Sequence, residues 1–147
     1  MRTRRALAPV AALGVLVAAL SGCAALRNEW SGKHGGPDVD GEVRAAVSGA
    51  LPDATGVAVR SQKNGFAQEM TVAITFPSAT FEAEALLATA RAVCGAVDRT
   101  DTVFVEVADA PTGHPLDLAP LVAGTPLDTP YDPTAVRIEV TDDCPAL

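Results

Sequence analysis

His114 and Asp117 come closest, among the side chains of this sequence, to a pair that could do acid–base chemistry. An imidazole three residues before a carboxylate could act as a base held by an orienting acid, but no known motif places a nucleophile beside them. The chain also lacks a glycine-rich phosphate loop, His-Glu-x-x-His and Gly-x-Ser-x-Gly. We therefore expect no cofactor and no metal, and the sequence favours a binding or accessory module over an enzyme.

The first 22 residues contain the parts of an export signal in the order that export needs. Residues 2–5 hold three arginines, and residues 6–20 form an uncharged stretch rich in Ala, Val and Leu. This stretch of about 15 residues is short for a ~30 Å hydrocarbon core but suits the apolar centre of a signal peptide. The tetrapeptide Leu20-Ser21-Gly22-Cys23 follows at once.

This segment resembles the signal peptide and lipobox of bacterial lipoproteins, in which an aliphatic residue and two small ones precede the modified cysteine. The resemblance implies that a diacylglyceryl group is attached to the Cys23 thiol, which its small neighbours leave accessible. It also implies cleavage of the bond between Gly22 and Cys23, with a further acyl chain on the new amino group. Two or more chains anchor a protein stably, whereas one is marginal.

The resemblance therefore implies a location at the cell membrane, on its extracytoplasmic face, and it covers the leader and Cys23 only. Export by the general secretory route is favoured, although the Arg4-Arg5 pair leaves the twin-arginine route open. The composition, rich in Ala, Val, Asp, Thr and Pro, is similar to that of high-GC actinobacterial proteins.

With Cys23 assigned to the lipid, Cys94 and Cys144 are left, and an even pair in an oxidising compartment predicts one disulfide. Cys94 falls near the end of an expected helix and Cys144 just after the last expected strand, so the bond would tie the C-terminus to the helix layer. Closing a loop of about 50 residues stabilises by at most about 4 kcal/mol in the chain-entropy model. The alternative, a redox-active pair, lacks the close Cys-x-x-Cys spacing.

The net charge of the chain argues against some classes of binding partner. Three of the 11 basic residues lie in the leader and all 18 acidic residues lie after it, so cleavage changes the formal charge from −7 to −10. An acidic surface repels phosphate backbones and anionic lipid heads, which argues against nucleic acid as a partner. Solubility explains this charge most simply, and cationic partners or cell-wall metal ions are the alternative.

The first half of the mature chain shows a helix followed by a hairpin. Apolar residues at every fourth position predict a helix over 39–51, capped by Asp38 or Asp40 and ended before Pro52. A short strand over 57–60 and a turn at 63–65 lead into a clear alternation from residue 66. The face of this second strand expected to be buried carries Phe66, Met70, Val72, Ile74 and Phe76.

The second half repeats the pattern of helix, strand and strand. A helix over about 79–97, capped by Ser78 or Thr80, has an apolar stripe, and strands are expected over 102–108 and 134–141. The inner stripe of this helix is Phe81, Leu86, Ala90, Val93 and Val97.

The order αββαββ predicts an α+β domain in two layers, with a four-stranded, mainly antiparallel sheet and two helices on one face. We expect a signal peptide over 1–22, a lipidated flexible tether over 23–38 and a single domain over 39–147.

The connection over 109–133 is long for a link between two strands, and it is rich in proline. Long ordered loops are often functional, so this segment is the first candidate for a partner surface. The candidate contact residues are His114, Leu116, Leu118 and Leu121. The alternative is that these residues fold back and cover the open face or edge of the sheet, because an apolar patch is seldom left exposed.

Two functions are consistent with these features. The first is a lipid-anchored, non-enzymatic module that binds an envelope protein or a cell-wall polymer through the long loop or the exposed sheet face. The second is a small-ligand carrier or accessory enzyme with a site between the helix layer and the sheet, which would need an internal pocket with converging polar groups.

Overall fold

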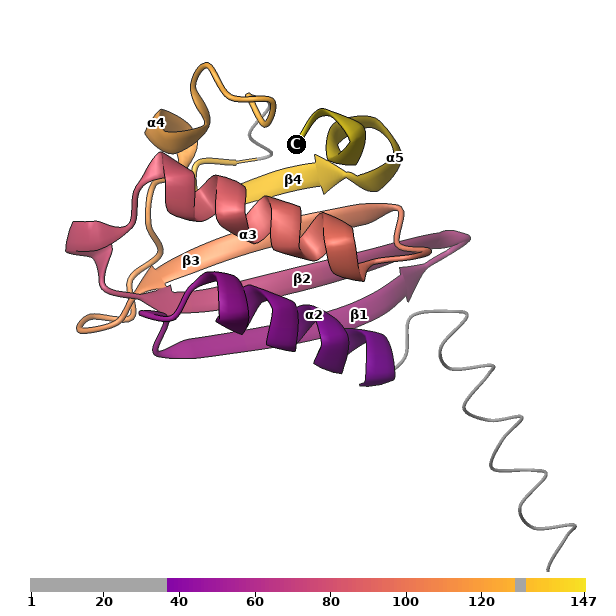
Figure 1. Cartoon of the computed structure of the whole chain (residues 1–147), viewed down its shortest axis with the longest axis horizontal. Helices are drawn as coiled ribbons and strands as arrows, with labels where there is room; N and C mark the ends of the chain where they lie inside the picture. Colours follow the sequence, from indigo (N-terminus) through magenta and orange to yellow (C-terminus); the bar gives the residue numbers. More distant parts are fainter. Residues whose placement is uncertain (1–36, 129–131) are drawn as a thin grey trace, which may run out of the picture.

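The computed structural model describes residues 37–128 and 132–147 of the chain (Figure 1). The expected signal peptide, Cys23 and most of the tether lie outside the described residues. In chain order the elements are α2 (Pro37–Ala50), β1 (Gly56–Asn64), β2 (Ala67–Phe76), the 3-10 turn η1 (Ser78–Thr80), α3 (Ala83–Ala96), β3 (Thr102–Asp109), α4 (Ala119–Val122), β4 (Ala135–Glu139), α5 (Val140–Asp143) and the 3-10 turn η2 (Cys144–Ala146).

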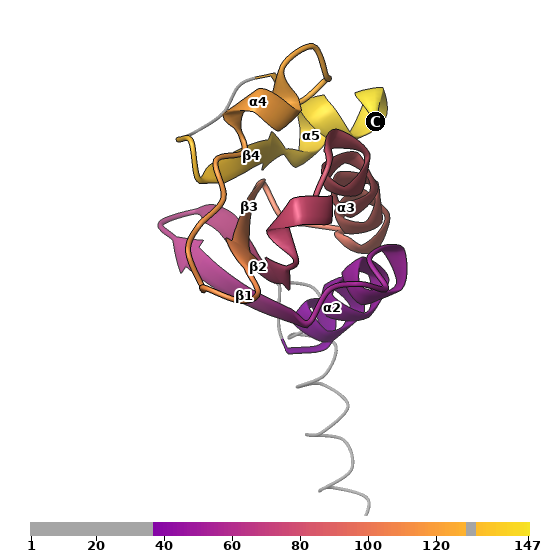
Figure 2. The ribbon, with the colours of Figure 1, turned by 90° about the vertical axis from the view of Figure 1, so that its left-hand side faces the viewer.

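The four strands form one sheet in the order β1-β2-β3-β4. The outer pairs, β1 with β2 and β3 with β4, are antiparallel, and the central pair, β2 with β3, is parallel. A parallel pair needs a crossover connection, and α3 supplies it. Figure 2 shows α2 and α3 on the same side of the sheet. The predicted two-layer α+β fold with a mainly antiparallel sheet is confirmed.

The core lies between the sheet and these two helices. Alternate residues of each strand point to the helices, as the period of two requires, and the apolar stripes of α2 and α3 meet them. The fully buried side chains of this layer include Val43, Val47, Met70, Val72, Leu86, Ala90, Val93, Val103, Val105, Val136 and Ile138. Valine is the commonest residue of this core and aromatic rings are few. Phe76 and Phe81 meet edge to face, 5.1 Å between ring centres.

The turn of the first hairpin differs from the prediction. Asn64 pairs with Ala67, so the turn consists of Gly65 and Phe66, and Gly65 has a φ of 64°. Such two-residue turns need positive φ, which glycine adopts without strain. Phe66 was expected on the buried face of β2 but is fully exposed, because it belongs to the turn and lies beyond the last residue that the helices cover.

The helix starts also differ from the prediction. α2 begins at Pro37, so neither Asp38 nor Asp40 caps it, and proline is favoured in a first helical turn. α3 begins only at Ala83, after η1, and its N-cap residue Glu82 makes no side-chain cap bond. The Thr80 hydroxyl donates instead to the backbone oxygen of Pro77, which closes η1.

The last strand is shorter than expected. β4 ends at Glu139, and the residues from Val140 form the short helix α5 instead of continuing the strand. The Asp143 carboxylate accepts a hydrogen bond from the Glu139 N–H at 2.7 Å, which stabilises this turn. No helix within the described ranges has both the length and the apolar character needed to cross a bilayer.

Candidate functional site

The first part of the long loop is hydrogen-bonded to the end of β3. The Asp109 N–H donates to the His114 oxygen at 2.8 Å, and the Leu116 N–H donates to the Val107 oxygen at 2.8 Å. The segment 114–116 therefore lies beside the last residues of β3, past the point where β4 pairs with that strand. The loop is thus held by backbone bonds at its start.

The middle of the loop packs into the core. Leu118, Val122 and Leu127 are at most 1% exposed and belong to the main apolar cluster, while Leu116 and Leu121 are half-buried against it. Leu118 therefore cannot contact a partner directly, which corrects its place among the candidate contact residues. The alternative expected from the sequence is right that these residues fold back, but they join the main core instead of covering the open face of the sheet.

His114 is the one candidate contact residue of the loop that is exposed. The Asp117 carboxylate accepts from the Ala119 N–H at 3.1 Å and so supports the start of α4. In this arrangement the acid stabilises a turn and is not hydrogen-bonded to the imidazole as an acid–base pair would be.

The sheet face away from the helices carries a row of polar residues that includes one aromatic ring. The strand registers place Arg60, Thr71, Phe104 and Arg137 side by side across β1, β2, β3 and β4. Arg137 pairs with Glu139, and the Thr102 hydroxyl donates to Glu139 at 3.0 Å. We call the exposed residues of this side the open sheet face. It offers charged groups at both edges and an aromatic ring between them.

Two neighbouring shallow hollows lie on the open sheet face, of about 360 and 340 Å³. They share Gln62 and Thr71, so together they form one depression across the sheet. The first is lined otherwise by Ala58, Val59, Arg60 and Ala73, and the second by Asn64, Glu69, Phe104, Glu106, Asp132 and Ala135. Hydroxyl, amide and carboxylate groups beside a ring suit contact with a polar peptide or polymer.

Asp132 lies at the rim of the second hollow in a tight hydrogen-bonded turn. The Thr134 hydroxyl and the Thr134 N–H both donate to its Oδ1, at 2.7 and 2.6 Å. These bonds favour the ionised form and hold the pKa of the Asp132 carboxyl below its ordinary value of 3.8. The rim of the hollow therefore keeps a negative charge at neutral pH.

The interior offers little to a ligand. The buried Thr89 hydroxyl donates to the Ala85 oxygen at 2.9 Å, and buried Asp109 accepts from the Thr112 hydroxyl at 2.6 Å. Within residues 37–128 and 132–147, every buried side-chain nitrogen or oxygen has a hydrogen-bond partner. The same part of the chain holds no group of three or more His, Cys, Asp or Glu side chains arranged for a metal ion. The buried polar side chains of these residues are therefore already paired within the fold.

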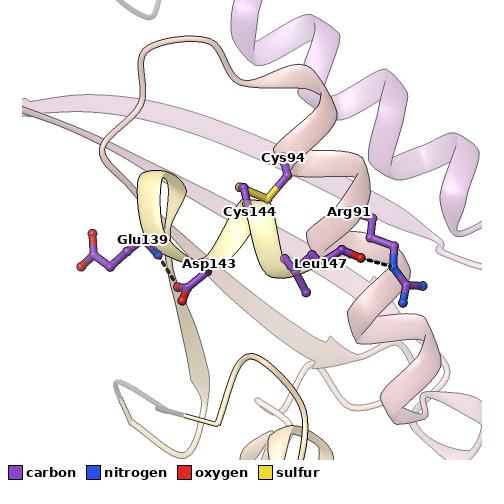
Figure 3. The surroundings of a disulfide bond; sticks show 6 residues. All are labelled: Arg91, Cys94, Glu139, Asp143, Cys144 and Leu147. Atoms are coloured by element: carbon purple, nitrogen blue, oxygen red, sulfur yellow. Dashed lines mark hydrogen bonds between the residues drawn. A yellow bond between two sulfur atoms is a disulfide. The ribbon is translucent and has the colours of Figure 1, made fainter.

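The predicted disulfide is confirmed. Cys94 on α3 is bonded to Cys144 in η2, with 5.5 Å between their Cα atoms, within the usual range (Figure 3). Nearby, Arg91 Nε donates to the backbone oxygen of Leu147 at 3.1 Å, and the same guanidinium pairs with Glu84. The last residues of the chain are thus held to α3 by a covalent bond and a charged hydrogen bond.

The depression on the open sheet face was not predicted from the sequence, although the face itself was. Alternation along β2 placed Glu69, Thr71 and Ala73 outward, but it did not show that Thr71 lies beside Phe104. That register depends on how α3 crosses from β2 to β3, and no local pattern in the sequence determines it.

Comparison with known proteins adds no family to this description. No protein-family model matches the chain, and neither the curated proteins nor the solved structures contain a significant match.

Proposed function

We propose that this chain is a lipid-anchored module of the bacterial cell envelope that binds a protein or cell-wall partner and catalyses no reaction. In this proposal Cys23 carries the lipid on the outer face of the membrane. Partner contact involves the exposed part of the long loop around His114 and the open sheet face. The module needs no cofactor for this role.

The disulfide is the observation that carries the proposal. Disulfides form and persist outside the cytoplasm, so the bond between Cys94 and Cys144 agrees with export by the leader. The sequence has three cysteines, and the bond leaves Cys23 as the thiol available for lipid. The same sulfur that the lipobox resemblance selects is therefore the one that is not in the disulfide.

The positions of the long loop and of the start of α2, at opposite ends of the sheet, support the placement of the binding surface. The long loop begins after Asp109, which pairs with Phe76 at the end of β2. α2 begins at the other end of the sheet, since Asp40 in its first turn contacts Ser61 near the end of β1. A chain tethered through the start of α2 therefore presents the loop on the side away from the tether (Figure 1).

The packed interior disfavours the alternative, a carrier or accessory enzyme with a site between the two layers. Such a site needs converging polar groups, whereas the inner faces of β2 and β3 carry Met70, Ile74 and valines that are essentially unexposed.

Deleting the loop does not test the proposal, because Leu118 and Val122 belong to the core and their loss would disrupt the fold. Photo-crosslinking in living cells tests the proposal without disrupting the core. A photoreactive amino acid replaces His114 in the loop or Glu106 on the open sheet face, and exposed Ser48 on α2 serves as the matched control. We expect His114 or Glu106 to capture a discrete partner that Ser48 does not. Identical adducts at all three positions, or none at the first two, would contradict the proposal.

A further inference from the structure

Phe66 is the feature that the fold and the proposed function leave unexplained. Its side chain is fully exposed, and within residues 37–128 and 132–147 it is the one large hydrophobic residue that is exposed. A single exposed apolar residue is common on protein surfaces and is not by itself a binding site. The position of this ring on the molecule supplies the second observation.

The hairpin holds the ring away from the domain. Asn64 and Ala67 pair across the turn, and the strands behind them pair without interruption as far as Gly56 with Thr75. A residue in a two-residue turn between long paired strands has little freedom to fold back onto the core. The Phe66 side chain is therefore accessible to a surface that approaches this end of the sheet.

The start of α2, through which the proposed tether joins the domain, lies at the same end of the sheet. Asp40 in the first turn of α2 bonds to both the N–H and the hydroxyl of Ser61. Ser61 is four residues before Gly65, which is about 13 Å along a strand. Figure 1 shows the start of α2 and the tip of the β1–β2 hairpin at the same end of the molecule.

The length of the connecting segment brings this end close to the lipid. About 14 residues separate Cys23 from Pro37, which span at most about 50 Å when fully extended. A chain of that length behaving as a flexible linker has a typical end-to-end distance of about 20 Å. A bilayer that holds Cys23 therefore lies within reach of the hairpin tip, whereas the loop around His114 is at the far end.

We infer that Phe66 inserts into the interface of the bilayer that holds Cys23 and orients the domain with the β1–β2 hairpin toward the membrane. The inference rests on the proposed lipid anchor. Aromatic rings are favoured at the interface between headgroups and acyl chains. The anchor makes insertion an intramolecular event, so one ring contributes at a high effective concentration.

The contact is apolar and not electrostatic. After cleavage the chain carries an excess of acidic residues, which disfavours adsorption to anionic lipid heads. Lys63 is the cation next to the turn, while Glu69 accepts from Gln62 at 3.1 Å within the sheet. Insertion should therefore occur in purely zwitterionic vesicles, where there is no net surface charge to attract a cation.

The experiment uses the full lipidated protein in phosphatidylcholine vesicles. In a Trp30→Phe background, Phe66→Trp provides the only tryptophan, and Ala79→Trp at the opposite end of the sheet is the matched control. We expect brominated acyl chains to quench on the order of half of the Phe66→Trp fluorescence and to leave the Ala79→Trp fluorescence almost unchanged. Equal quenching at both positions, or none at position 66, would overturn the inference.

Flotation of the same vesicles separates the two proposals. Protein that floats with the lipid but shows no quenching at position 66 contradicts the inference and leaves the lipid anchor standing. Protein that does not float contradicts both. A photoreactive group at position 66 that captures a protein instead of a lipid in living cells would also overturn the inference, because the hairpin tip would then belong to a protein interface.

Discussion

The carboxylate of Asp40 on α2 accepts hydrogen bonds from both the N–H and the hydroxyl of Ser61, on the outer side of edge strand β1. The opposite edge has the same arrangement, because Asp143 of α5 accepts from the N–H of Glu139 on β4. An unpaired N–H on an edge strand is a template for another strand. Each edge of this sheet therefore has one outward N–H satisfied by an aspartate from an adjacent helix.

Replacing Asp40 should weaken the fold and expose the edge of β1. Because Asp40→Ala leaves a half-buried N–H without its charged acceptor, we expect the free energy of unfolding to fall by about 1–2 kcal/mol in urea titrations. Ser61→Ala, which removes only the hydroxyl, should cost less. Glu42→Ala on the exposed side of α2 is the control. Equal stabilities for Asp40→Ala and Glu42→Ala would refute this assignment.

Removing the disulfide should destabilise the domain without changing its topology. The bond closes a separation of 50 residues, so the double variant Cys94→Ser/Cys144→Ser should lose about 2–4 kcal/mol of unfolding free energy. Reduction of the native protein by a dithiol should give the same loss. If the double variant unfolds at the same urea concentration as the oxidised protein, the C-terminus is held mainly by its noncovalent contacts.

Substitutions at Leu118 and His114 should distinguish the packing role of the long loop from its role in partner binding. Leu118 is fully buried, so Leu118→Ala should cost about 2–5 kcal/mol of stability and reduce binding only through unfolding. His114→Ala should leave the thermal unfolding midpoint almost unchanged and lower the yield of partner crosslinks from the loop. A stable Leu118→Ala protein would show that this leucine does not support the core.

Thr134 should control the ionisation of Asp132. Thr134→Val removes the hydroxyl donor, so the pKa of the Asp132 carboxyl should rise toward its ordinary value while staying lowered by the backbone N–H. A carboxyl whose pKa is lowered by folding stabilises the folded state at every pH above its unfolded pKa. This contribution is lost as the pH falls through the folded pKa. The variant should therefore be less stable than the native protein at neutral pH, and this difference should vanish as the pH falls below the folded pKa. Carboxyl NMR titration measures the shift, and an unchanged Asp132 titration would disprove the cause.

The elements that could be predicted from the sequence are those with a strong internal period. The alternation along β2 from Met70 to Phe76 identified the buried face, and the four-residue spacing from Val43 to Val47 identified α2. The pairing of Cys94 with Cys144 followed from a count of cysteines, because one pair is left once the expected lipobox claims Cys23. In the strand and the helix, neighbouring residues carry the signal themselves.

The errors fall where backbone pairing or packing overrides the side-chain pattern. Phe66 has the parity of the buried face, but the pairing of Asn64 with Ala67 places it in the turn. Val140 continues the alternation of β4, yet Asp143 draws the backbone into α5. The depression on the open sheet face depends on the parallel register of β2 and β3, which only the packing of α3 determines.

The proposed anchor depends on the sulfur of Cys23, so intact mass analysis of protein purified from its native membrane is the decisive measurement. We expect a polypeptide that begins at Cys23 and carries the added mass of a diacylglyceryl group, with Cys94 and Cys144 oxidised. A chain that still begins at Met1, or one whose Cys23 sulfur is unmodified, would contradict it.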